Sequence, residues 1–430
     1  MPIDIVILTN GPGEVATWVK PVVQSLRVKA DNTKSSIRIS VMLSPCPHAS
    51  GQEPLTLAQY PEVDRVQSAS HFFKFLLTGK TAGSWDWHPQ GVVVFLGGDQ
   101  LYPVLVSRRL GYRSVTYAEW EARWLSLIDC FGVMQPNLIE KAPARYRHKL
   151  TLVGDLMADV QATARRQDIT DALGCDEADQ IIGFLPGSKP VKLSVGMPLL
   201  LAIAYHLHTQ QPPTGNRLQH VISVAPNLTI PELMRYTDPA KNPAAALVNF
   251  PPISLIEPHT GLPYIQIKNG PKVFLWQQFP ALDLFSQCAL CLTTIGANTA
   301  QLGALATPMI VLLPTQQMDG AKVLDGLPGL IARTPGLGAI ARKFITPLII
   351  RTVQKSGKRF AWPNIWAKRE VVPELLGHIT AEAVGAIARD YLTHPQKLDD
   401  MRQTLRDLRG PSGAADKMAA LILETVNYPK

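Results

Sequence analysis

The chain has 430 residues, which is enough for two or three domains of ordinary size. Hydrophobic residues make up 46% and charged residues 18%, a globular balance that excludes a largely disordered chain. The formal net charge is +8. Met1–Thr9 lacks the basic start of a secretory leader, and no apolar run reaches the roughly 18 residues of a membrane span, so we expect a cytoplasmic protein.

The first half alternates apolar, β-branched runs with helix-like stretches. Such alternation, with strands that are apolar almost throughout, predicts a parallel sheet covered on both faces. The predicted strands are 3–8, 37–43, 92–96 and 114–117, and the predicted helices are 15–29 and 101–110.

The same pattern restarts after a polar, helical stretch at 162–179. Its predicted strands are 181–185, 220–224, 272–275, 288–293 and 309–313, with a helix at 194–208 and amphipathic helices at about 381–392, 396–408 and 414–425. The fold class is therefore α/β, with two Rossmann-like domains whose parallel sheets face a central cleft. We expect the domains at 1–165 and 175–394, and we expect the helices from about 395–430 to pack back on the first domain.

The basic excess is concentrated between 333 and 359, where seven Lys and Arg residues alternate with apolar ones and no acid occurs. This pattern suits an anionic membrane surface, although a solvated helix face would look the same. No aromatic stacking platform accompanies the charges, so nucleic acid is not an expected partner. The preceding stretch, 316–337, is rich in Gly and Pro and reads as a loop or flap.

Cys288 and Cys291 form a CxxC pair within an apolar run, without a second Cys or His pair nearby. We interpret them as part of a buried strand, because a zinc or redox site needs further ligands or a different context.

Two stretches in the first half end a strand with glycines and an acid. The first is Thr9-Asn-Gly-Pro-Gly-Glu14, where Gly11 and Gly13 allow a ligand to approach the backbone. The second is Val92-Val-Val-Phe-Leu-Gly-Gly-Asp99, where the carboxylate can take a proton from an acceptor hydroxyl. A plain tight turn and a helix N-cap are the respective alternatives.

Two stretches in the second half are suited to phosphate binding. Gly187, Ser188 and Lys189 follow a predicted strand, and their N–H groups and cation can cradle a diphosphate, although the Walker spacing is missing. After another strand comes a Gly loop and helix start at Gly296, Ala297, Asn298 and Thr299, with Gln301 in reach of ribose hydroxyls. Close packing of small residues is the alternative for this helix.

A further polar group lies in an apolar stretch near 362–376. It comprises Asn364, Arg369, Glu370 and Glu374. These residues are candidates for donor binding, and an internal Arg–Glu pair that fixes the loop is the alternative. Pro373 fits the first turn of a helix.

Taken in this order, the stretches resemble the lipid-A-disaccharide synthase family, glycosyltransferase family 19. The similarity runs thinly over nearly the whole chain and is densest near the end. The matching residues are Gly13-Glu14, Asp99, Val153-Gly with Ala158-Asp159, Leu185-Pro-Gly-Ser188, Gly296 with Thr307-Pro-Met309, and Pro363-Asn-Ile with Ala367, Arg369-Glu370 and Pro373-Glu-Leu-Leu376.

The resemblance implies a GT-B fold, an inverting transfer from a UDP-sugar to a lipid-linked sugar, and a peripheral place on the inner face of the membrane. It implies no metal and no cofactor. Asp99 would be the base, with Glu14 as a second catalytic acid, and Lys189 with the helix start at Gly296 would hold the diphosphate.

Several site positions differ from the family pattern, including Tyr102, Asp155, Lys192 and Gln301, and there is an insertion at 316–342. Two alternatives therefore stay open. One is a sugar-nucleotide epimerase on the same scaffold, which needs acid–base pairs such as Asp99 and Glu14. The other is a non-catalytic relative that binds a sugar nucleotide or a lipid.

Overall fold

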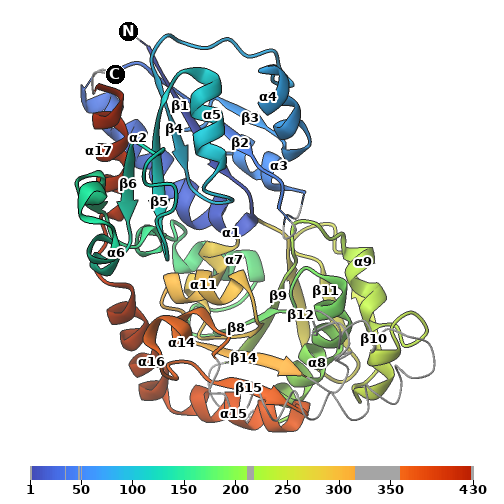
Figure 1. The fold of residues 1–430 in the computed structure, drawn as a ribbon. Helices are drawn as coiled ribbons and strands as arrows, with labels where there is room; N and C mark the ends of the chain where they lie inside the picture. The colour runs from blue at the N-terminus through green and yellow to red at the C-terminus, as the bar shows by residue number, and fades with distance from the viewer. Residues whose placement is uncertain are drawn as a thin grey trace, which may run out of the picture. The chain divides into compact units, whose positions relative to one another are not determined.

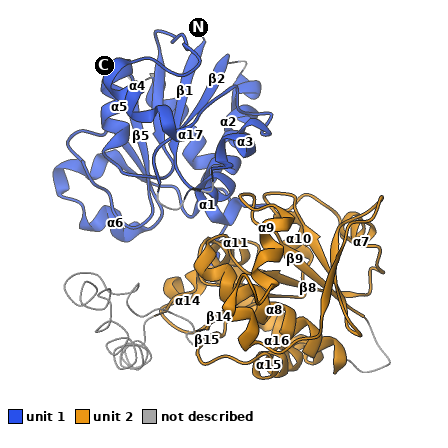
Figure 2. Ribbon diagram, turned by 90° about the vertical axis from the view of Figure 1, so that its right-hand side faces the viewer, with its two compact units in different colours: residues 1–161, 409–430 blue, residues 162–408 orange. Residues whose placement is uncertain are grey.

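The computed structural model describes residues 2–33, 35–46, 49, 51–210, 217–314 and 359–427. The chain forms two compact units, Met1–Gln161 with Arg409–Lys430, and Ala162–Leu408 (Figure 2). The return to unit 1 thus begins at Arg409, whereas we expected it from about 395. The predicted membrane-binding segment 333–359, apart from Arg359, and the insertion 316–342 lie outside the described residues.

Unit 1 is built on a seven-stranded, entirely parallel sheet (Figure 1). Its strands, in the order β3-β2-β1-β4-β5-β6-β7, are β1 (Ile3–Thr9), β2 (Ile37–Leu43), β3 (Arg65–Gln67), β4 (Gly91–Phe95), β5 (Arg113–Ala118), β6 (Cys130–Val133) and β7 (Leu150–Leu152). In β1, Ile5 lies opposite Ile39 of β2 and Val92 of β4. These positions are fully buried, as expected of a parallel sheet covered on both faces.

Helices cover both faces of this sheet. They are α1 (Pro12–Glu14), the π-helical turn η1 (Val15–Val19), α2 (Lys20–Thr33), α3 (Glu53–Ala58), η2 (Ala69–His71), α4 (Phe72–Thr78), α5 (Tyr102–Leu110), α6 (Pro136–Lys141), η3 (Ala144–Lys149), η4 (Leu156–Asp159) and α17 (Ala414–Asn427). Val6, Leu8 and Val93 pack with Phe72 of α4 and Val106 of α5. Strand residues alternate between faces, so Ile5 and Ile7 point to the other face.

Helix α17 completes unit 1 although it comes from the far end of the sequence. It contacts α2 and the strands β4, β5 and β6. A Cβ on Gly132 of β6 would lie 2.6 Å from Sδ of Met418, so the helix sits directly on the strand. The Asp159 carboxylate caps the helix start by accepting hydrogen bonds of 2.6 Å from the N–H groups of Gly413 and Ala415.

Unit 2 contains an eight-stranded sheet in the order β10-β11-β12-β9-β8-β13-β14-β15. The strands are β8 (Gln180–Leu185), β9 (Leu218–Ser223), β10 (Ile253–Ile256), β11 (Tyr264–Ile267), β12 (Lys272–Trp276), β13 (Leu290–Thr294), β14 (Met309–Pro314) and β15 (Glu374–Gly377). Six of them are parallel, and the hairpin strands β10 and β11 extend one edge antiparallel. Pro373 therefore precedes a strand, and the predicted helix start there is wrong.

The helices of unit 2 again lie on both faces. They are α7 (Arg166–Leu173), α8 (Pro190–Thr209), α9 (Ile230–Met234), η5 (Arg235–Thr237), η6 (Pro243–Leu247), α10 (Leu282–Gln287), α11 (Ala297–Ala304), α14 (Trp362–Ala367), α15 (Ala381–Thr393) and α16 (Pro395–Arg409). One apolar cluster joins the sheet to α8 and α15, and a second joins it to α7, α10, α11 and α16. Cys288 and Cys291 are free and buried in the second cluster.

Helix α8 differs from our expectation about membrane spans. Its 20 residues are long and apolar enough to cross a membrane by length and composition alone. However, 67% of its apolar window is buried in the protein, where Leu193, Met197 and Leu200 pack on the sheet. Burial against the sheet is a sufficient reason for its composition.

Candidate functional site

Both parallel sheets change their winding direction at one point. In unit 1 the chain builds β1, β2 and β3 outward and then returns to place β4 beside β1, and in unit 2 it returns in the same way to place β13 beside β8. Open α/β sheets bind ligands at such switch points, outside the carboxyl ends of the strands. Most of the predicted site residues follow β1, β4, β8 or β13 directly.

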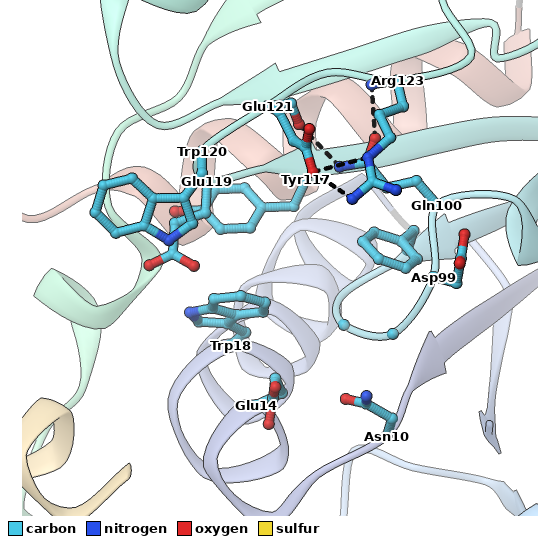
Figure 3. Close-up of a pocket in the computed structure, with 13 residues that line it drawn as sticks. Asn10, Glu14, Trp18, Asp99, Gln100, Tyr117, Glu119, Trp120, Glu121 and Arg123 are labelled. Atoms are coloured by element: carbon cyan, nitrogen blue, oxygen red, sulfur yellow. Dashed lines mark hydrogen bonds and ion pairs between the residues drawn. The ribbon is translucent and has the colours of Figure 1, made fainter. Parts of the chain in front are cut away.

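The unit 1 switch point contains a pocket of about 380 Å³ (Figure 3). Three loops line it, those after β1, β4 and β5, together with the helical turn η1. The lining residues are Asn10, Glu14, Trp18, Phe95, Gly97, Gly98, Asp99, Gln100, Tyr117, Glu119, Trp120, Glu121 and Arg123. The volume is within the range of small-molecule sites.

Glycines in two loops make room for the Glu14 side chain. A Cβ on Gly11 would lie 2.5 Å from Oε2 of Glu14, and one on Gly97 would lie 2.9 Å from its Cγ. The space beside Gly11 is therefore occupied by a carboxylate of the chain itself, whereas we predicted that a ligand would approach the backbone there. Neither Gly11 nor Gly13 is among the lining residues, and the carbonyl of Gly13 accepts a hydrogen bond from Oγ1 of Thr17.

Asp99 lines the pocket and also stabilises the start of α5. Its Oδ1 accepts a hydrogen bond of 2.8 Å from the N–H of Leu101, and its carbonyl accepts one of 2.9 Å from Tyr102. The N-cap residue of α5 is Leu101, so the predicted cap role of Asp99 is wrong; its carboxylate instead bonds the turn just before the helix and remains a candidate site group. Asp99 is exposed, and the preceding Gly97 and Gly98 have φ of +125° and +113°, which side chains rarely adopt.

Glu119, directly after β5, is a site carboxyl that our sequence reasoning missed. Burial, with the nearby charges of Asp155 and Glu14, raises the pKa of Glu119 to about 8. Burial also raises the pKa of Glu14, to which the charge of Glu53 contributes. A carboxyl that titrates near neutral pH can both donate and accept a proton in the working range. Its position at a strand end beside β4 was the available signal.

The loop after β5 is held in place by Gln100. The Gln100 side chain donates a hydrogen bond of 2.9 Å to the carbonyl of Glu121 and accepts one of 2.8 Å from the N–H of Arg123. The Arg123 guanidinium in turn forms an ion pair with the Glu121 carboxylate. These bonds tie the β5 loop to the β4 loop, so the pocket wall is built rather than accidental (Figure 3).

Aromatic rings supply the apolar part of the wall. Trp18 packs edge-to-face on Tyr117 with ring centroids 5.2 Å apart. Trp120 is 48% exposed. Flat aromatic faces next to carboxylates suit a ligand with both C–H and hydroxyl or amine groups, such as a sugar.

The unit 2 switch point is built around a cation, Lys192, in the first turn of α8. Its Nζ donates a hydrogen bond to the carbonyl of Ile295, which connects the loop after β8 to the loop after β13. A Cβ on Gly187 would lie 3.1 Å from Cβ of Lys192, and one on Gly296 would lie 2.9 Å from its Nζ. Burial and the charge of Lys189 lower the pKa of Lys192, and none of the described acidic residues forms an ion pair with it.

The other predicted phosphate-binding residues lie at the starts of the two helices that follow these loops. Ser188 and Lys189 are exposed at the start of α8, and Ala297 and Asn298 open α11. The buried hydroxyl of Thr294 has no hydrogen-bond partner within the described chain. Two helix starts, two lysines and an unpartnered hydroxyl suit an anionic group such as a diphosphate.

Unit 2 contains a pocket of about 350 Å³, and Ser188 is one of its lining residues. Asn227, Arg235, Tyr236 and Lys241 are among its other lining residues. The Asn227 side chain donates to the carbonyl of Ser188, and its Oδ1 has no partner within the described residues. An aromatic ring with amide and cationic groups suits a nucleoside next to the phosphate site.

The other predicted donor residues form an internal network. The fully buried Asn364 donates to Val372 and Glu374 and accepts from the N–H groups of Val371 and Val372. Glu374 also accepts from the N–H groups of Phe360 and Ala361. These bonds fix the loop that packs on α11, where Thr299 accepts a hydrogen bond from Trp362.

The remaining three residues of this set are placed differently. Arg369 and Glu370 are exposed, and Glu370 pairs with Arg359 at 3.3 Å, so the predicted internal pair has a different arginine. Gln301 is 6% exposed within α11, which leaves little surface for a ribose. The structure therefore gathers Gly187, Ser188, Lys189, Gly296, Ala297 and Asn298 at the switch point, whereas it uses Asn364 and Glu374 to hold a loop.

Solved structures are similar to the chain over its whole length. No protein-family model matches it, and no curated protein is similar to it in sequence. A putative UDP-N-acetylglucosamine 2-epimerase from Listeria monocytogenes has 13% identity and a TM-score of 0.55, over 100% of this chain and 99% of that one. The S. aureus protein MnaA with UDP has 10% identity and a TM-score of 0.51, over 97% and 95%.

A third structure is the UDP-GlcNAc 2-epimerase from Neisseria meningitidis bound to UDP-GlcNAc. It has 11% identity and a TM-score of 0.50, and 99% of each chain is covered. At these identities the similarity shows the fold alone. Two α/β units with parallel-dominated sheets, in a chain that follows these proteins from end to end, make this a protein of the GT-B fold.

Proposed function

We propose that the protein is a glycosyltransferase that moves a sugar from a UDP-sugar to an acceptor hydroxyl with inversion. The observation that carries the proposal is the division of chemistry between the two switch points. Unit 2 presents Lys189, Lys192 and two helix starts to an anion, and unit 1 presents a separate acid-lined pocket. A separate pocket of hexose size is what a second substrate needs.

In this mechanism Asp99 takes the proton of the acceptor hydroxyl as its oxygen attacks the anomeric carbon. The bond between that carbon and the diphosphate oxygen breaks, and the electron pair leaves with UDP. Lys189, Lys192 and the N–H groups at the starts of α8 and α11 stabilise the charge that develops on the leaving diphosphate. Tyr236 and Asn227 border the space next to Ser188 and would receive the nucleoside.

A lipid-linked acceptor agrees with the surface around the pocket. Trp120, Trp124 and Leu127 lie in the β5–β6 loop and are 48%, 43% and 39% exposed. Clustered exposed apolar side chains are typical of lipid or partner contacts. We propose that the protein works on the inner face of the membrane. Co-sedimentation of the full chain with anionic but not with neutral vesicles tests this location.

The central test is release of UDP from a panel of UDP-sugars in the presence of glycolipid acceptors. We expect turnover with at least one pair, loss of turnover in Asp99→Asn, and normal turnover in Asp31→Asn, which removes an exposed carboxylate of α2. Absence of turnover with every pair would contradict the proposal. Unchanged UDP affinity with equal inactivity of wild type and Asp99→Asn would favour a non-catalytic binding protein.

Glu119 favours a second candidate, an epimerase that acts on the sugar of a UDP-sugar. A carboxyl with a pKa of about 8, in the same pocket as Glu14, can supply the proton donor and acceptor that such a reaction needs. Incubation with UDP-GlcNAc alone, followed by proton NMR, separates the two functions. The epimerase converts the sugar without an acceptor, whereas the transferase leaves it intact.

A further inference from the structure

The unit 1 pocket has an unbalanced charge. Glu14, Asp99, Glu119 and Glu121 all line it, and Arg123 is the cationic lining residue. Arg123 is paired with Glu121 and also interacts with the charge of Asp99, whereas Glu14 and Glu119 have no ion-pair partner in the part of the chain that the structure describes. A pocket of this kind repels an anionic ligand and attracts a cation.

Two of these carboxyls are also close enough to affect each other. The charge of Glu14 contributes to the raised pKa of Glu119, after burial and the charge of Asp155. In the empty pocket this repulsion favours protonation of one carboxyl. A cation bound near them would favour the ionised carboxylates, so its binding would be coupled to loss of that proton.

Buried polar atoms in the same wall also point to a ligand. Trp18 is only 9% exposed, and its indole Nε1 has no hydrogen-bond partner among the described residues. The buried Oδ1 of Asn10 has none either. Buried donors and acceptors are normally satisfied, so these atoms are ready for ligand groups. In Figure 3 the Trp18 indole lies between the carboxyls of Glu14 and Glu119.

We propose that the unit 1 pocket binds an amine-bearing sugar, with its ammonium group attracted by the carboxyls of Glu14 and Glu119 and its ring against Trp120, which lines the same pocket and is 48% exposed. Aromatic faces strengthen this preference, because their negative quadrupoles attract a cation. The inference deepens the proposed function: it identifies the acceptor as an aminated head group and excludes one whose phosphate would enter this pocket. The binding itself requires neither a donor nor turnover.

The test is equilibrium binding of small probes to the full chain, followed by NMR of the tryptophan indole N–H signals. The probes are methyl glucoside, its 2-amino-2-deoxy and 6-amino-6-deoxy analogues, and glucose 1-phosphate. We expect at least one amine to bind about tenfold or more tightly than methyl glucoside, and the phosphate to bind more weakly than methyl glucoside.

Variants assign the preference to the two carboxyls. The double variant Glu14→Gln/Glu119→Gln should bind the amine and methyl glucoside equally well. Asp31→Asn is the matched control, because it removes an exposed carboxylate of the same unit that does not line the pocket, and it should keep the preference. The proposal is overturned if neither amine binds better than methyl glucoside, or if the preference survives in the double variant.

A failure here is distinguishable from a failure of the proposed function. Release of UDP with an uncharged acceptor, together with no amine preference, would retain the transferase and reject the aminated head group. Amine binding without turnover under any condition would retain the amine site and reject the transferase.

Discussion

The two switch points share a strand order but differ in charge. In each unit the first six parallel strands follow the order third, second, first, fourth, fifth, sixth, so each fold offers the same location for a ligand. In unit 1 the loops place Glu14, Asp99 and Glu119 there, and in unit 2 they place Lys189 and Lys192. The fold determines where a ligand binds, and the loop residues determine which chemistry occurs.

Glycine has the corresponding role in both places. Gly11 and Gly97 leave room for the Glu14 side chain, and Gly187 and Gly296 leave room for the Lys192 side chain. In each unit two loops from neighbouring strands thus close around one charged side chain, acidic in unit 1 and basic in unit 2. Four changes test this contrast.

Asp99→Asn should have the largest effect, and it should change the chemistry in unit 1 without changing UDP binding in unit 2. We expect turnover to fall about 100- to 10,000-fold, because a general base is lost, while UDP affinity stays unchanged. Steady-state rates and calorimetric UDP binding measure the two quantities. A comparable fall in UDP affinity would show that the acid belongs to the donor side.

Lys192→Met should produce the opposite pattern. We expect UDP to bind about 10- to 100-fold more weakly, because a charge-assisted contact is lost, and the unit 1 probes to bind as before. Lys268→Met, at an exposed position of unit 2, is the control. Equal UDP affinity in both variants would mean that Lys192 only joins the two loops through Ile295.

Asn364→Ala tests whether the loop network is structural. We expect the free energy of unfolding to fall by about 1–3 kcal/mol, because buried N–H groups of Val371 and Val372 lose their acceptor. Denaturant titration measures the loss, and the exposed Arg369→Ala should show none. UDP affinity of the folded variant should be nearly that of wild type; a large drop at unchanged stability would instead assign Asn364 to the donor site.

Glu119→Gln should change the way in which the free energy of unfolding depends on pH. The pKa of Glu119 is about 4.5 when unfolded and about 8 when folded. Between these values the folded chain binds more protons than the unfolded chain, so wild-type stability falls as pH rises through this window. Asp155, with its pKa raised to about 6, and Glu14 act in the same direction.

We therefore expect the free energy of unfolding of Glu119→Gln to gain on wild type as pH rises from 5 to 8. Urea titrations at several pH values measure the gain, and Glu121→Gln should follow wild type. Parallel pH curves for Glu119→Gln and wild type would mean that the carboxyl is well solvated.

Sequence patterns predict the sheets better than the site. The apolar runs at 37–43 and 309–313 match β2 and β14 within one residue, because parallel strands buried on both faces are apolar throughout. The hairpin strands β10 and β11 were missed because each is only four residues long, and more and less buried positions alternate along it instead of forming an apolar run. Asp99 and Lys189 were found through adjacent glycines, whereas Glu119 follows its strand without one.

Asn364 and Glu374 show a different limit. A polar residue in an apolar stretch is equally typical of ligand binding and of an internal hydrogen-bond network. Only the placement of Val371, Val372 and Phe360 around these side chains shows the network. The repulsion between Glu14 and Glu119 likewise depends on residues that are far apart in sequence.

The return of the chain at Arg409 affects the order of events during translation. Unit 2 is continuous, so all of its residues have left the ribosome before α17 appears. Unit 1 begins first but finishes last, because the face of β6 that receives Met418 stays uncovered until then. The sheet of unit 1 is therefore completed only after α17 has been synthesised, and a premature stop codon before Ala414 would leave β6 without the helix that covers it.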